Sequence, residues 1–138
     1  MSTSSPAAVT RGIHHLGLTV PDVVAARDFF IAMLGFSERG GVPDYPAVFV
    51  GDGSIVLTLW QARADAAVVP FDRHHNIGLH HLALAVADAA TLDALAARLA
   101  ACADVTIEFP PQALGRDGAR HMMCVIPGGI RLELAQPA

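Results

Sequence analysis

Two stretches of the sequence each carry a pair of adjacent histidines, and the stretches are near copies of one another. Residues 12–22 read Gly-Ile-His-His-Leu-Gly-Leu-Thr-Val-Pro-Asp, and residues 78–88 read Gly-Leu-His-His-Leu-Ala-Leu-Ala-Val-Ala-Asp. A repeat at about half the chain length indicates one supersecondary unit that is used twice. Imidazole is the commonest metal-binding side chain, so the repeat could bring two such ligands to one site.

Only one histidine of each pair can point toward that site, because adjacent side chains of a strand point to opposite faces. His15 shares its face with the small residues at positions 17 and 19, and His81 shares its face with those at 83 and 85. His14 and His80 alternate in step with large leucine and valine residues, which we expect to pack beneath a helix. Small residues leave room for a ligand, so we predict His15 and His81 as the functional pair.

A carboxylate near the end of the chain supplies a third candidate. Glu133 and Arg131 alternate with the apolar residues of segment 130–134, so both are expected on the face opposite the core. His15, His81 and Glu133 form a set of two histidines and one carboxylate, which suits a divalent transition metal and leaves positions for water or substrate. A histidine at one strand start is more often structural, and Glu133 alone is compatible with a solvent-facing residue. The duplicated histidine position is what favours a metal site.

The elements that must position these residues follow from the pattern of apolar residues. Alternation predicts strands at residues 15–20, 47–50, 54–60, 81–86, 105–109, 121–126 and 130–134. Asp22 and Asp88 are predicted to cap two helices. Residues 37–46 hold two glycines and two prolines and predict a turn-rich connection, and Pro110-Pro111 is predicted to stop a strand. Each half reads as β-α-β-β-β, with a short second strand in the first half, where alternation identifies three of the four strands. Two such modules facing each other would form an α+β domain with a half-closed barrel around a metal cleft.

Length and composition indicate a single domain that is large enough for a hydrophobic core. The chain of 138 residues is expected to fold over residues 11–138 after a flexible tail at 1–10. Module one spans 11–61, a linker spans 62–77, and module two spans 78–138. The net charge of -4 argues against nucleic-acid binding, and no apolar run is long enough to cross a membrane, so a cytoplasmic protein is expected. All nine basic residues are arginine, which excludes a Schiff-base lysine.

In order and spacing, four segments of the chain resemble the vicinal oxygen chelate superfamily, which includes glyoxalase I, fosfomycin- and bleomycin-resistance proteins and extradiol dioxygenases. The segments are His15–Val20, Phe29-Phe30 with Leu34-Gly35-Phe36, His81–Val86, and Pro127–Leu134. The resemblance implies a glyoxalase-like fold of paired βαβββ modules and metal ligands at His15, His81 and Glu133. It also implies a homodimer with the site at the subunit interface, where His15 of one subunit meets His81 and Glu133 of its partner.

The sequence departs from the glyoxalase I pattern at one ligand position. That resemblance implies a fourth ligand, a carboxylate or its equivalent, in the last strand of module one, where this chain has Thr58 or, in a shifted register, Val56. Neither is a strong ligand, which favours a three-ligand site. Thr58, Arg120 and Arg131 are predicted to bind substrate, the arginines through an anionic group. Arg120 and His121 both border the site, and only one of the two can face it.

The leading hypothesis is a metal-dependent glyoxalase-like enzyme of the lyase, isomerase or transferase type. A divalent ion (Fe, Mn, Ni or Zn) would chelate two neighbouring oxygens of a small substrate, and Glu133 would also serve as the base. Two alternatives stay open. One is an Fe(II)-dependent extradiol-type dioxygenase, although those proteins are mostly longer. The other is a metal-free binding protein of the bleomycin-resistance type, which does not need the set of two histidines and one glutamate.

Overall fold

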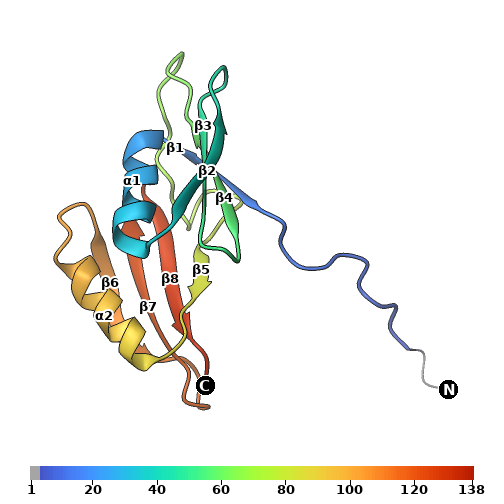
Figure 1. The fold of residues 1–138 in the computed structure, drawn as a ribbon, viewed down its shortest axis with the longest axis vertical. Helices are drawn as coiled ribbons and strands as arrows, with labels where there is room; N and C mark the ends of the chain where they lie inside the picture. Colours follow the sequence, from blue (N-terminus) through green and yellow to red (C-terminus); the bar gives the residue numbers. More distant parts are fainter. Residues whose placement is uncertain (1–3) are drawn as a thin grey trace.

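The computed structural model describes residues 4–138 and contains the repeated βαβββ arrangement that the sequence predicts (Figure 1). The first module comprises β1 (Leu16–Val20), α1 (Val23–Leu34), β2 (Ser37–Val42), β3 (Ala47–Gly51) and β4 (Val56–Gln61). The second comprises β5 (Leu82–Ala85), α2 (Ala89–Ala100), β6 (Thr106–Ala113), β7 (Arg120–Ile126) and β8 (Ile130–Gln136). The predicted tail lies partly outside the described residues, at positions 1–3. Neither helix in the described part of the chain has the length and apolar character of a membrane span.

Each module forms its own four-stranded sheet, and the two sheets have equivalent strand orders. The orders are β1-β4-β3-β2 in the first sheet and β5-β8-β7-β6 in the second. In both sheets the first strand of the module runs parallel to the last, and the other neighbours are antiparallel. The registers are equivalent too, since Gly17 lies opposite Thr58 and Ala83 lies opposite Glu133. No strand pair joins the two sheets within residues 4–138. The two sheets of one chain therefore do not join into the expected half-closed barrel.

Both helices begin at the predicted aspartates. The Asp22 carboxylate accepts a hydrogen bond from the backbone N–H of Val24 at 3.0 Å, and Asp88 accepts one from Thr91 at 2.8 Å. These bonds satisfy N–H groups that have no partner within the first helical turn. Gly35 ends α1 with a φ of 73°, the left-handed conformation that glycine adopts without strain.

One hydrophobic core runs through both modules on the side that the helices cover. Figure 1 shows α1 and α2 on the same side of the molecule; α1 contacts β3 and β4, α2 contacts β6, β7 and β8, and the helices contact each other. In β1, Leu18 and Val20 are buried while Gly17 and Thr19 are exposed, as the alternation predicts. The other face of each sheet is not covered by α1 or α2. We call these faces the first open face (Gly17, Thr19, Ala47, Phe49, Thr58 and Trp60) and the second open face (Ala83, His121, Met123, Arg131 and Glu133).

Two local predictions were wrong, and both concern edge strands. Residues 37–42 form β2 rather than part of a turn-rich connection, and a Cβ on Gly41 would lie 2.5 Å from the carbonyl oxygen of Ala47 on β3. Gly41 therefore permits close strand approach. The strand β6 continues through Pro110-Pro111 to Ala113, with shifts of register against β7. Proline is tolerated there because β6 is an edge strand and its free side needs no N–H donor.

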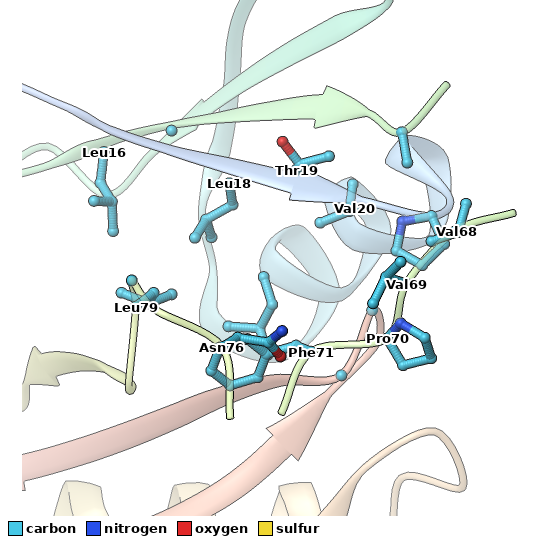
Figure 2. A pocket seen from close by; sticks show the side chains of 17 residues that line it. Leu16, Leu18, Thr19, Val20, Val68, Val69, Pro70, Phe71, Asn76 and Leu79 are labelled. Atoms are coloured by element: carbon cyan, nitrogen blue, oxygen red, sulfur yellow. The ribbon is translucent and has the colours of Figure 1, made fainter. Parts of the chain in front are cut away.

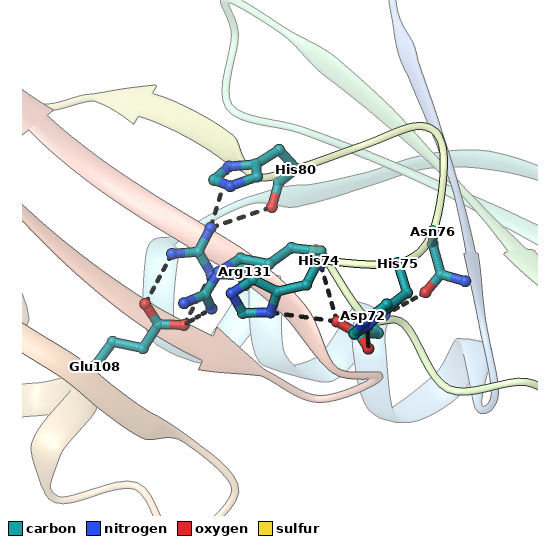
Figure 3. A network of polar contacts seen from close by, with 8 residues as sticks. Asp72, His74, His75, Asn76, His80, Glu108 and Arg131 are labelled. Carbon is teal, nitrogen blue, oxygen red and sulfur yellow. Dashed lines mark hydrogen bonds and ion pairs between the residues drawn. The ribbon is translucent and has the colours of Figure 1, made fainter.

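A buried arginine ties the second sheet to the linker. Arg131 is 8% exposed, and its Nε and Nη2 each donate to a different carboxylate oxygen of Glu108 on β6 at 2.8 Å. Arg73 of the linker donates to the same carboxylate at 3.0 Å. The Nη1 of Arg131 also donates to the backbone carbonyl of His80 at 3.3 Å (Figure 3). One guanidinium thus connects β8, β6 and the entry to β5, which is the strand that follows His81.

We expect Glu108→Gln to destabilise the protein in a pH-dependent way. The hydrogen bonds from Arg131, together with the charges of Arg131 and Arg73, hold the pKa of Glu108 below its ordinary value of 4.5. A lowered folded-state pKa contributes stability that is present above the unfolded-state value and is lost as the pH falls through the folded-state value. The variant should lose about 1–3 kcal/mol of unfolding free energy at pH 7, with the deficit shrinking below about pH 4.5.

Urea denaturation from pH 7 to pH 3 measures this deficit. Asp93→Asn is the matched control, because Asp93 pairs with Arg120 at the exposed surface at 3.2 Å and such pairs contribute little. A deficit for Glu108→Gln that stays constant across this pH range would contradict the assigned role of the carboxylate.

Candidate functional site

The second open face carries a carboxylate held between two imidazoles. Glu133, near the middle of β8, is 8% exposed. Its Oε2 lies 2.9 Å from Nε2 of His81, and its Oε1 lies 2.6 Å from Nδ1 of His121. Each carboxylate oxygen therefore has its own histidine partner.

Strand order explains why these three side chains meet. The strand β8 lies between β5 and β7, so Glu133 has Ala83 on one side and Met123 on the other in the register. His81 precedes β5, and His121 is the second residue of β7. Glu133 faces away from the core because Leu132 and Leu134, its neighbours along β8, are both fully buried beneath it.

His121 is the site residue that sequence reasoning left undecided. Met122 and Cys124 are fully buried on the helix side of β7, so His121 faces the second open face with Glu133. Arg120 lies on the opposite side of the strand and donates to Asp93 of α2 at 3.2 Å. The sequence holds no alternating signal here, because residues 122–126 are all apolar.

The predicted ligand His15 lies in the other module. It precedes β1, and its Nδ1 is 2.8 Å from Nδ1 of His14. The structure thus brings together His81 and Glu133 of the predicted set, with His121 beside them, but does not bring His15 to them within one chain. Across residues 4–138, no group of three or more histidine, cysteine or acidic side chains has an arrangement that could hold a metal ion.

The distance between His81 and Glu133 fits a shared metal ion. Two ligands that bind one ion at right angles, each at about 2.1 Å, lie about 3 Å apart, and the Nε2 to Oε2 separation here is 2.9 Å. A neutral imidazole nitrogen and a carboxylate oxygen are donors that suit Zn, Mn, Fe or Ni. The pair therefore has the donor chemistry expected of two of the three predicted ligands.

Thr58 occupies in the first sheet the position that Glu133 occupies in the second. It lies opposite Gly17 in the register, as Glu133 lies opposite Ala83, so the unshifted alignment is the observed one. The Thr58 hydroxyl accepts a hydrogen bond from Nε1 of Trp60 at 2.9 Å. The first sheet thus presents a neutral hydroxyl where the second presents a carboxylate.

Arg131 shares the second open face with Glu133 but already has protein partners. Its guanidinium donates to Glu108 through two nitrogens and to the carbonyl of His80 through the third. The predicted contact of Arg131 with an anionic substrate group would have to compete with this ion pair. We therefore do not include Arg131 among the proposed substrate contacts.

An apolar pocket lies away from this cluster. It has a volume of about 1050 Å³ and lies between β1, the linker and the turn that leads into β8 (Figure 2). The residues that line it include the apolar side chains of Leu16, Leu18, Val69, Phe71 and Leu79. None of the predicted metal ligands lines it. Its lining residues come from both modules and from the linker between them.

Comparison with known proteins identifies solved structures with the same fold and a family whose profile matches this chain. A sequence profile of the Glyoxalase/Bleomycin resistance protein/Dioxygenase superfamily matches residues 12–134. A glyoxylase/bleomycin resistance protein/dioxygenase domain from Frankia sp. EAN1pec is similar with a TM-score of 0.78 at 25% identity, covering 94% of this chain and 93% of that chain. A search among curated proteins finds no significant match.

Two further solved structures share the fold at lower identity. Lactoylglutathione lyase from Agrobacterium tumefaciens has a TM-score of 0.70 at 24% identity, covering 94% of this chain and 96% of that chain. The fosfomycin resistance protein FosX from Listeria monocytogenes has a TM-score of 0.71 at 15% identity, with the same two coverages. The profile match spans most of the sequence, and the chain therefore belongs to the Glyoxalase/Bleomycin resistance protein/Dioxygenase superfamily.

Proposed function

We propose that this chain is a divalent-metal-dependent enzyme that chelates two neighbouring oxygens of a small substrate. The observation that carries the proposal is the Glu133 carboxylate, which lies 2.9 Å from His81 through one oxygen and 2.6 Å from His121 through the other. In this proposal Oε2 and the His81 nitrogen share one ion, while His121 holds Oε1. A ligating carboxylate that is itself hydrogen-bonded is typical of metal sites.

The third ligand is proposed to come from a second copy of the chain. His15 precedes β1 just as His81 precedes β5, and the register of the two sheets is equivalent. Because the sheets are not closed into a barrel within one chain, each open face is available to a partner. In the proposed homodimer, His15 of one protomer completes the site formed by His81 and Glu133 of the other.

The chemistry of the site divides between the ion and the chain. When bound, a divalent ion (Fe, Mn, Ni or Zn) would supply Lewis acidity toward the substrate oxygens. Glu133 is the carboxylate proposed to accept a proton on this face, through Oε1, the oxygen that does not bind the ion and that His121 orients. The Thr58 hydroxyl, in the equivalent position of the first sheet, is placed to contact substrate from the opposite side of the interface.

Mixed dimers test the shared site directly. Histidine-to-alanine variants at 15 and at 81 should each lose the bound ion as homodimers, whereas a mixed dimer should regain about one ion per dimer. The reason is that one of its two sites combines the intact His15 of one protomer with the intact His81 of the other. Differently tagged chains allow the mixed dimer to be purified, and elemental analysis then counts the metal.

The matched control is His74→Ala, which removes an exposed linker histidine and should keep the full metal content. A mixed dimer with no metal would place His15 and His81 of the same chain in one site. Full metal content in the His81→Ala homodimer would remove the proposed site altogether, and wild-type protein that binds none of the four metals would favour a metal-free binding protein. Oxygen uptake with a catechol in the presence of Fe(II), absent with Zn, would assign the dioxygenase alternative.

We expect His121→Ala to weaken metal binding by about 10- to 100-fold, because loss of a partner that orients a ligating carboxylate has effects of this size. His121→Gln, which retains an N–H donor, should recover part of the affinity. Competition with a chromogenic chelator measures both values. Met123→Leu changes the neighbouring residue on the same face without removing a polar group and serves as control. Equal affinities in wild-type and His121→Ala protein would show that His121 does not orient Glu133.

A further inference from the structure

The first open face presents a cluster of aromatic rings. Trp60 of β4 lies between Tyr45, whose ring centre is 5.1 Å away, and Phe49 of β3, whose ring centre is 6.2 Å away. Tyr45 is 51% exposed, and the other two rings are half-buried. The distances lie in the range at which aromatic rings interact favourably, so the three rings form one preformed apolar surface.

Small residues and one hydrogen bond fix how this surface is presented. A Cβ on Gly17 would lie 3.2 Å from the Thr58 hydroxyl and 3.6 Å from Nε1 of Trp60, so glycine leaves room for the hydrogen bond between these two groups. The Trp60 N–H donates to Thr58 at 2.9 Å. The only polar group of the indole is therefore satisfied within the protein, and the ring offers a ligand apolar surface in a fixed orientation.

We propose that Tyr45, Phe49 and Trp60 bind a planar aromatic group of the substrate. This inference rests on the proposed function, in which the oxygens of the substrate are held by His81 and Glu133 of the partner protomer. Thr58 is equivalent in register to Glu133, so the rings adjoin the part of the first open face that would meet the metal ligands. A flat ring gains edge-to-face or offset contacts with a preformed aromatic cluster that a saturated group of similar size does not. The substrate class is thus an aromatic compound with two neighbouring oxygens.

Three matched acids test the proposal. Mandelate, hexahydromandelate and lactate share one hydroxyl and one neighbouring carboxylate, and they carry a phenyl, a cyclohexyl and a methyl group. Trp60 is the only tryptophan in the chain, so its fluorescence reports on this surface. In metal-loaded wild-type protein we expect mandelate to shift the Trp60 emission and to bind at least ten times more tightly than lactate, with hexahydromandelate clearly weaker than mandelate.

Two variants separate ring contacts from chelation. Tyr45→Ala and Phe49→Leu should each weaken mandelate binding by about tenfold and leave lactate binding unchanged, since a contact confined to the ring contributes nothing to lactate. Val24→Ala, which shortens an exposed apolar side chain on α1, is the matched control and should change neither the mandelate affinity nor the lactate affinity. Circular dichroism confirms that each variant is folded, and calorimetry gives the affinities.

Repeating the titrations after metal removal by a chelator distinguishes the two proposals. If the metal site is wrong but the aromatic surface is right, the preference for mandelate over hexahydromandelate persists and the chelator has no effect. If the metal site is right but the aromatic surface is wrong, the three acids bind alike and all binding disappears with the metal. Absence of mandelate binding at millimolar concentration would overturn the proposal that these rings bind an aromatic group. Equal losses of affinity for mandelate and lactate in Tyr45→Ala would overturn it as well.

Discussion

The arrangement of the second sheet depends on how a nearly buried carboxylate is satisfied. Glu133 is only 8% exposed, and an ionised carboxylate without partners is costly to remove from water. His81 and His121 meet this requirement with one contact to each oxygen. The βαβββ order makes the contacts possible, because it inserts the last strand of the module between the first strand and the preceding one. A core-facing leucine on each side of Glu133 then fixes which way the carboxylate points.

Duplication of the module has produced two faces with the same geometry and different chemistry. At equivalent register positions the second sheet has a carboxylate at Glu133, while the first has the neutral hydroxyl of Thr58 bonded to an indole. The second open face carries a carboxylate between two imidazoles, and the first is lined by aromatic rings. On the proposed dimer these faces are complementary, since a chelating substrate needs charged ligands for its oxygens and apolar contacts for the rest of its structure.

Features of the site that depend on local alternation could be predicted from the sequence, whereas those that depend on pairing partners could not. Apolar residues at helical spacing and two aspartate caps located both helices, and the alternation of leucines around Glu133 placed it opposite the core. The edge strand β2 was missed because Gly40 and Gly41 resemble a turn, although Gly41 is required by the close approach of Ala47. The partner of Arg131 was missed because Glu108 is distant in sequence and reaches it only through the order of β6, β7 and β8.

The pairing of Arg131 with Glu108 also bears on the chemistry of Glu133. Arg131 and Glu133 lie two residues apart on the same face, so an unpaired guanidinium there would attract the Glu133 carboxylate and compete with a cation for it. Glu108 binds the guanidinium through two hydrogen bonds of 2.8 Å, which leaves both oxygens of Glu133 to the histidines. The remaining nitrogen of Arg131 holds the carbonyl of His80 and so fixes the backbone next to His81. The same ion pair thereby keeps the carboxylate available and positions its neighbour, so a buried arginine is compatible with the proposed cation site beside it.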